Sequence, residues 1–183
     1  MHGFRKAILA LSGGLDRVIS GCTIVFLVVL VAVVMLQVVA RYVFASPPPW
    51  TEEAARYAMI WAGLLGATMS FKRRFDPALF KEPGQSALLA TASLLMQSAI
   101  VLIYLLPILW HTVYGPYMNP TRGFLLRHSR MMADALPFPT ILVAISVPIM
   151  IVTILIHLSA RWCGDDRPAD VSDPEISGRQ VLD

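Results

Sequence analysis

The chain has 183 residues, of which 56% are hydrophobic and only 15% charged, and its formal net charge is +3. Ordinary soluble domains have about 45–50% apolar and about 25% charged residues. The apolar residues also come in uninterrupted blocks, which is typical of membrane-spanning helices. This composition excludes an ordinary soluble domain, and it leaves no separate basic domain that would bind nucleic acid.

Four apolar blocks predict an all-α membrane protein with four transmembrane helices. The first block runs from Val18 to Ala40 without a charged residue. The others cover about residues 54–71, 86–110 and 137–158. Residues 1–162 are therefore expected to form a single four-helix domain in the lipid bilayer.

The first block has an alternative interpretation as a secretory signal peptide. Arg5 and Lys6 precede it, and Val38-Val39-Ala40 resembles a cleavage site. A signal core has about 7–15 apolar residues, and this block is much longer. We therefore expect a helix that is retained.

The residues before the first block place an apolar stripe on one face of a helix and charged residues on the other. The stripe consists of Phe4, Ile8, Leu11, Leu15 and Val18. This pattern predicts either an interfacial amphipathic helix on the cytoplasmic membrane surface or an early start of the first span. Periodicity alone favours neither alternative.

The distribution of Lys and Arg predicts the orientation. These residues are concentrated in the N-terminal segment, the connection after the second block and the C-terminal segment. Cytoplasmic segments retain positive charge, so both termini are expected to be cytoplasmic. The tail, residues 163–183, combines acidic residues with Pro, Ser and Gly, which predicts disorder.

The polar residues predict no catalytic, substrate-binding, metal or cofactor site. Cys22 and Cys163 form no C-x-x-C pair, and His111 and His157 fall at predicted opposite sides of the membrane. The interiors of the spans carry almost no ionisable residue, which a proton or ion path normally needs. The chain is therefore not expected to transport a solute alone.

Small residues recur at every fourth position of the second block. They are Ala54, Ala58, Ala62, Gly66 and Ser70, with Gly63 and Ala67 beside them. Such a face lets another helix approach closely in lipid. The partner is either a helix of the same bundle or a second polypeptide.

The first connection and the start of the second helix lie in residues 41–57. Three prolines cannot continue the first span, and Thr51 is predicted to cap the second helix, with Glu52 and Glu53 in its first turn. Glu52 and Arg56 are four residues apart and are expected to pair. Three aromatic residues suit the headgroup level of a membrane: Tyr42, Trp50 and Tyr57.

This stretch resembles a known family. It reads R-Y-V-F, then P-x-P-W-T-E-E and A-R-Y, followed by W-x-G-x-x-G (Trp61, Gly63, Gly66) and a basic K-R-R loop. These motifs are similar to those of the small membrane subunit (Q-type, DctQ-like) of tripartite ATP-independent periplasmic (TRAP) transporters. The dense part covers about residues 41–74, and the four-span layout extends a weaker resemblance over nearly the whole chain.

The resemblance implies a multi-pass subunit in the bacterial cytoplasmic (inner) membrane. In that family a periplasmic binding protein delivers an organic anion, such as a carboxylate or sugar acid, to a large membrane subunit that couples import to the sodium gradient. The small subunit packs beside the large one and braces its fixed scaffold. The binding protein is expected to make a transient contact with the outer connection, residues 111–136.

We expect one set of residues to have structural and interface roles rather than to bind substrate. They are Arg41, Tyr42, Trp50, Glu52, Glu53, Arg56, Tyr57, Ala58, Ala62, Gly63 and Gly66. Two alternatives remain: a stand-alone channel or exporter that self-associates through the small-residue face, and an intramembrane enzyme with Glu52 and Glu53 as catalytic carboxylates. Helix capping and dipole compensation explain the two carboxylates better than catalysis does.

Overall fold

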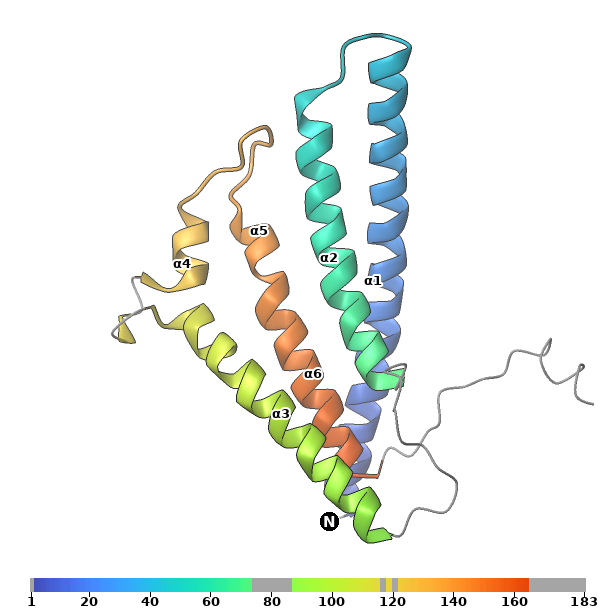
Figure 1. Cartoon of the computed structure of the whole chain (residues 1–183), viewed down its shortest axis with the longest axis vertical. Helices are drawn as coiled ribbons and strands as arrows, with labels where there is room; N and C mark the ends of the chain where they lie inside the picture. The colour runs from blue at the N-terminus through green and yellow to red at the C-terminus, as the bar shows by residue number, and fades with distance from the viewer. Residues whose placement is uncertain (1, 74–86, 116–117, 120–121, 165–183) are drawn as a thin grey trace, which may run out of the picture.

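A computed structural model describes residues 2–73, 87–115, 118–119 and 122–164 of the chain (Figure 1). In this part of the chain the regular structure is helical, with no β-strand. The helices are α1 (His2–Tyr42), α2 (Pro49–Arg73), α3 (Ala87–Val113), α4 (Phe124–Ser129), α5 (Ile141–Ala144) and α6 (Ser146–Trp162). The all-α prediction is confirmed for these residues.

Three helical segments of the described chain are long and apolar enough to cross a membrane: Gly3–Tyr42, Thr91–Val113 and Ile141–Trp162. They coincide with the first, third and fourth predicted blocks. α2 is a continuous helix of 25 residues, but it is rich in small and polar residues and is not among these three segments. The fourth membrane crossing therefore stays a prediction.

The N-terminal segment continues directly into the first apolar block. α1 runs without a break from His2 to Tyr42, so the structure has the early helix start rather than a separate helix at an angle to the span. A helix of this length extends about 60 Å, roughly twice the ~30 Å hydrocarbon core of a bilayer. One end of α1 must therefore reach beyond that core.

The start of α2 differs from the prediction. The helix begins at Pro49 rather than after an N-cap at Thr51, because proline has a φ suited to the first helical turn and lacks the N–H that would remain unbonded there. Thr51 is consequently not the N-cap. Its hydroxyl instead donates a hydrogen bond of 2.7 Å to the Pro48 carbonyl.

The last apolar block also begins later than predicted. The helical segment starts at Ile141 rather than Pro137, and Ile145 separates α5 from α6. Before it, the amide of Ala133 bonds to the Phe138 carbonyl at 3.0 Å, and Met132 pairs with Pro139 in an antiparallel bridge. Proline disfavours the helical conformation of the residue before it, so this proline-rich segment forms a tight connection instead of a helix.

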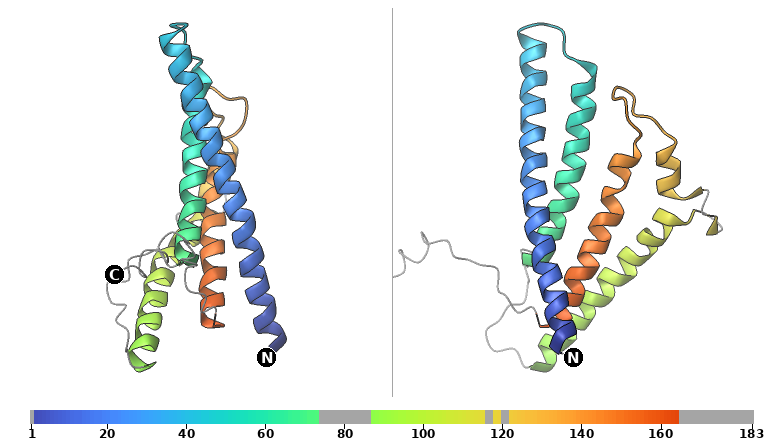
Figure 2. Two further views of the ribbon diagram at one scale, coloured as in Figure 1. Left: turned by 90° about the vertical axis from the view of Figure 1, so that its right-hand side faces the viewer. Right: turned by 180° about the vertical axis from the view of Figure 1, so that it is seen from behind.

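α1 and α2 form an antiparallel pair with a regular seam (Figures 1 and 2). Between Thr23 and Ala40, the residues of α1 shielded from solvent are spaced alternately by three and four. They are Thr23, Phe26, Leu30, Val33, Gln37 and Ala40. The facing stripe of α2 has the same spacing and consists of Thr51, Ala54, Ala58, Trp61, Leu65, Thr68 and Lys72. This spacing is that of closely packed helix pairs with a left-handed twist.

α6 is the central helix, because it packs against α1, α2 and α3. Its Ile151 is fully buried (0% exposed) and forms the core with Ile154 and with Leu105 of α3. α3 contacts the bundle along one face only, and it leans away from α6 toward α4 (Figures 1 and 2).

We call the end of the bundle with the N-terminus the inner end, and the end with the α1–α2 connection the outer end (Figure 1). Most of the predicted disordered tail lies outside the described residues, as do the basic residues Arg74 and Lys81. Of the tail, the structure describes Cys163 and Gly164, which follow α6. Gly164 has a φ of +82°, a left-handed conformation common just after a helix. The Arg5 side chain donates a hydrogen bond to the Cys163 carbonyl, which ties the start of α1 to the end of α6.

Candidate interface site at the outer end of α2

The first turns of α2 carry the predicted ion pair. Nη2 of Arg56 lies 2.9 Å from Oε1 of Glu52, and the two side chains are 58% and 71% exposed. An exposed pair at this spacing contributes only about 0.3–0.5 kcal/mol. The pair therefore contributes little to the stability of the fold, and it places two charged groups at the surface.

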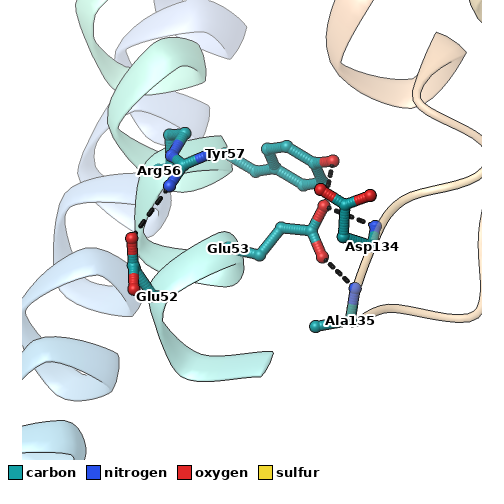
Figure 3. Close-up of polar contacts among 6 residues, drawn as sticks. All are labelled: Glu52, Glu53, Arg56, Tyr57, Asp134 and Ala135. Atoms are coloured by element: carbon teal, nitrogen blue, oxygen red, sulfur yellow. Dashed lines mark hydrogen bonds and ion pairs between the residues drawn. The ribbon is translucent and has the colours of Figure 1, made fainter. Parts of the chain in front are cut away.

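Glu53 points the other way and fastens α2 to a distant segment (Figure 3). Its Oε2 accepts the backbone amide of Ala135 at 2.7 Å, and its Oε1 accepts the amide of Asp134 at 3.1 Å. The hydroxyl of Tyr57 donates to Oε1 at 2.6 Å. We call these contacts the Glu53 latch. They hold the 131–140 connection against the start of α2.

The latch stabilises the ionised carboxylate. The hydrogen bond from Tyr57, followed by those from the backbone amides of the 134–136 segment, holds the pKa of Glu53 below its usual value of 4.5. Hydrogen bonds to the charged form favour that form. Glu53 is thus an acceptor for its neighbours and is not poised to donate or abstract a proton near neutral pH.

Trp61 joins three helices near the middle of α2. Its ring stacks on Phe26 of α1 with centroids 5.2 Å apart. Its Nε1 donates a hydrogen bond of 3.1 Å to the Leu142 carbonyl of α5. The sequence indicated Trp61 only as part of a family motif, and its partners are 35 and 81 positions away in the chain.

The small residues of α2 face two directions. Ala58 and Ala62 are buried inside the bundle, whereas Gly63 and Ala67 are exposed. Apart from the adjoining backbone of α2 itself, a Cβ added at Gly63 or Gly66 would have no atom within 4 Å. A stripe at every fourth residue rotates by about 40° at each step of a helix with 3.6 residues per turn, so it is buried only in its middle, at Ala58 and Ala62, and Gly66 is partly exposed.

The sequence left open whether the small residues of α2 contact a helix of this chain or a second polypeptide. In the structure these residues fall into two sets. Helices of the same chain cover Ala58 and Ala62. Gly63, Gly66 and Ala67 form a small-residue strip that no described helix covers, and we call it the outer strip of α2.

The remaining predicted interface residues lie near the α1–α2 connection. Tyr42 is 81% exposed, Trp50 is partly exposed, and Arg41 is exposed. Their exposure is compatible with headgroup or partner contacts, and their roles stay predictions.

Sequence reasoning missed a polar cluster at the inner end. Lys72 of α2 donates a hydrogen bond of 2.8 Å to the Ser12 carbonyl, and its Nζ lies 3.8 Å from a carboxylate oxygen of Asp16. The Ser12 hydroxyl lies 2.9 Å from Nδ1 of buried His157. The 3–4 spacing of residues 12, 16 and 19 was the available signal, because it places Ser12 and Asp16 on the seam.

The side chain of Arg161, in α6, also joins helices, because it contacts both α2 and α3. It donates to the Phe71 carbonyl at 2.6 Å and to Oε1 of Gln97 at 3.1 Å. Its guanidinium also lies 4.4 Å from the centre of the Phe71 ring. Lys72 and Arg161 thus bind helices together at the inner end, whereas Glu53 binds α2 to the 131–140 connection at the outer end.

The polar contacts named above join helices and connections of the chain to one another. No group of three His, Cys, Asp or Glu side chains in the described residues could hold a metal ion. The carboxylates proposed for an intramembrane enzyme are occupied by Arg56 and by backbone amides. The geometry therefore favours the structural explanation of Glu52 and Glu53.

Comparison with protein families gives a match over residues 30–167 to the tripartite ATP-independent periplasmic transporters, DctQ component. The chain belongs to this family. The resemblance in the first connection and the second helix is thereby confirmed. Neither the curated proteins nor the solved structures gave a match.

Membership makes the chain the small membrane component of a TRAP transporter, located in the inner membrane. This family is a family of transporter components and not of enzymes. Its members function in three-part systems with a large membrane subunit and a binding protein.

Proposed function

We propose that this DctQ-family chain is a scaffold that holds and stabilises the large subunit of a sodium-coupled importer of organic acids. The periplasmic binding protein delivers the acid, and the large subunit carries it across the membrane. Residues 1–162 act as one membrane domain with four spans, including α2, and both termini are cytoplasmic.

The distribution of polar groups carries this proposal. Charged side chains among the described residues gather at the two ends of the bundle, around Glu53 and around Lys72. Between them the helices meet through apolar groups such as Ile151, Leu105 and the Phe26–Trp61 stack. A path for an organic anion needs polar groups at membrane depth, so transport is assigned to the partner subunit.

The outer strip of α2 is the proposed contact for a helix of the large subunit. Gly63, Gly66 and Ala67 leave room for a close approach of two helix backbones, which favours association in lipid. The exposed Glu52–Arg56 pair lies on the same helix at the outer end and offers charges that fix the register. The buried residues Ala58 and Ala62 are assigned to the fold of this chain alone.

The outer connection is the proposed site of the transient contact with the binding protein. Its described part, up to residue 136, includes α4 and the first half of the segment held by the Glu53 latch. A contact surface fixed in this way loses less conformational entropy on binding than a free loop would.

Co-purification and transport together test the scaffold role. The tagged chain is purified in mild detergent, its partners are identified by mass spectrometry, and uptake is measured in liposomes with and without it. A stoichiometric subunit with many more spans, inactive or unstable without this chain, supports the proposal. Flux through the purified chain alone would establish the self-associating channel instead.

A further inference from the structure

Two arginines meet beside a serine where α2 ends against α1, which continues beyond it toward the N-terminus (Figure 2). Nη2 of Arg73, in the last turn of α2, donates a hydrogen bond of 3.0 Å to the Ser20 hydroxyl of α1. Arg17 precedes Ser20 by three positions, so their Cβ atoms lie about 5–6 Å apart on one face of α1. The hydrogen bond therefore brings the Arg73 guanidinium to the face of α1 that carries Arg17.

This face of α1 points away from the rest of the bundle. Ser12 and Ile19 are buried, and Ser12 contacts His157 of α6. At about 100° per residue, Arg17 lies roughly 140–160° around the helix from these two buried residues. Arg17 and Arg73 are both exposed, so a molecule outside the bundle can reach both guanidinium groups.

The two guanidinium groups have no carboxylate partner among the described residues. Asp16 is the one described carboxylate at the inner end, and it lies on the seam, 3.8 Å from Nζ of Lys72. The Ser20 hydroxyl accepts the bond from Arg73 and keeps its own proton for another acceptor. Guanidinium groups match the oxygens of phosphate with paired N–H donors. This set of donors therefore suits a phosphate group.

The spacing of charges along α1 gives the depth of the set in the membrane. No charged residue lies between Arg17 and Arg41, and the helix between these positions is about 36 Å long. This length slightly exceeds the ~30 Å hydrocarbon core, so Arg17 lies where the core meets the headgroups. The same face of α1 continues into the core with exposed apolar side chains, which are Ile24 (60% exposed), Val28 (62%) and Val31 (60%).

We propose that Arg17, Ser20 and Arg73 bind the phosphate of an anionic phospholipid in the leaflet at the inner end, which the proposed orientation makes cytoplasmic. Basic sites between transmembrane helices on that side are suited to anionic headgroups. A choline headgroup is disfavoured, because it places a positive charge near the two guanidinium groups. One acyl chain lies along the exposed apolar side chains of the same face. The bound lipid bridges α1 and α2.

Native mass spectrometry of the full chain, purified with any subunit it retains, tests the proposal. The samples come from nanodiscs of phosphatidylglycerol or of phosphatidylcholine. We expect one phosphatidylglycerol molecule to be retained, and phosphatidylcholine to be retained about tenfold less, because its headgroup weakens the charge-assisted contacts. R17Q/R73Q should lower phosphatidylglycerol retention by a similar factor. R17K/R73K keeps both charges but loses the paired donors, so its retention should be intermediate.

A single change separates lipid binding from folding. No hydrogen bond or ion pair within the described part of the chain involves the Arg17 side chain. R17Q should therefore leave the fold intact and lower phosphatidylglycerol retention by about threefold. The matched control is R127Q/R130Q, which removes the same charge from two exposed arginines outside the site and should leave retention unchanged. Circular dichroism and elution volume identify any variant that fails to fold.

Equal retention of the two lipids, or phosphatidylglycerol retention unchanged in R17Q/R73Q, would overturn the proposal. An equal loss in R127Q/R130Q would also overturn it, because overall charge rather than this site would then hold the lipid. Inorganic phosphate retained in place of lipid would assign the site to a free anion instead. Loss of the large subunit from R17Q/R73Q with bound lipid unchanged would assign the arginines to a carboxylate of that subunit. Lipid retention is measured without transport, so these results are independent of the scaffold role.

Discussion

Nε1 of Trp61 donates a hydrogen bond to the carbonyl oxygen of Leu142 at 3.1 Å. The same indole stacks on Phe26, so one side chain joins α2 to both α1 and α5. This contact links the N-terminal pair of helices to the last helical segment at the middle of the bundle.

Replacing Trp61 should destabilise the isolated chain in two steps. Trp61→Phe keeps an aromatic ring and loses one hydrogen bond, which should lower the free energy of unfolding by about 0.5–1.5 kcal/mol. Trp61→Ala also removes the packing and should cost more, up to the ~3–5 kcal/mol of a buried aromatic residue. Denaturant titration in detergent measures both, with Trp50→Phe as the control. Equal stability of wild type and Trp61→Ala would show that the contact does not hold the bundle together.

Glu53 should make stability depend on pH at the acidic end. Because its pKa in the folded chain lies below the usual 4.5, its contribution is present above that value and is lost as pH falls through the lowered pKa. Thermal unfolding at pH 7 and at acidic pH should show a smaller acid-induced loss in Glu53→Gln than in wild type. Glu52→Gln, which changes only the exposed pair, is the matched control. An unchanged acid-induced loss in Glu53→Gln would contradict the latch.

The two faces of α2 should respond differently to the same added side chain. Gly63→Leu meets open space, so the isolated chain should remain as stable or become more stable, since glycine costs about 0.5–1 kcal/mol in a helix interior. It should nevertheless reduce co-purification of the large subunit. Ala62→Leu overfills a buried position and should lower the free energy of unfolding by about 1–3 kcal/mol. Normal partner recovery with Gly63→Leu would move the interface to another face.

The inner cluster should show coupling between Lys72 and Asp16. Their side chains are 14% and 20% exposed, so removing one partner leaves a poorly solvated charge. Lys72→Met should lower the free energy of unfolding by roughly 1–3 kcal/mol, less than the ~3–5 kcal/mol of a fully buried pair. Asp16→Asn should cost less, because Lys72 also bonds the Ser12 carbonyl. A double-mutant cycle measures the coupling, and additive effects would show that the two charges do not interact.

Several features were predictable because they depend on nearby residues. The first helix ends at Tyr42, before the prolines at 47–49 that cannot continue it, and Glu52 pairs with Arg56 one turn away. The cap was mispredicted for a local reason too. Proline starts a helix as well as it ends one, and that second property decided where α2 begins.

Sequence by itself determined that the chain is helical and lipid-embedded, because the length and hydropathy of the apolar blocks determine which segments must be removed from water. It also determined the family, through motifs in a short stretch that the match over residues 30–167 confirms. Only the tertiary structure decided which small residues of α2 are buried, since that depends on how far the helix has rotated against α1 at each turn. The same holds for Glu53, whose amide partners lie 81 and 82 positions away and meet it only because the bundle brings the two connections together at one end.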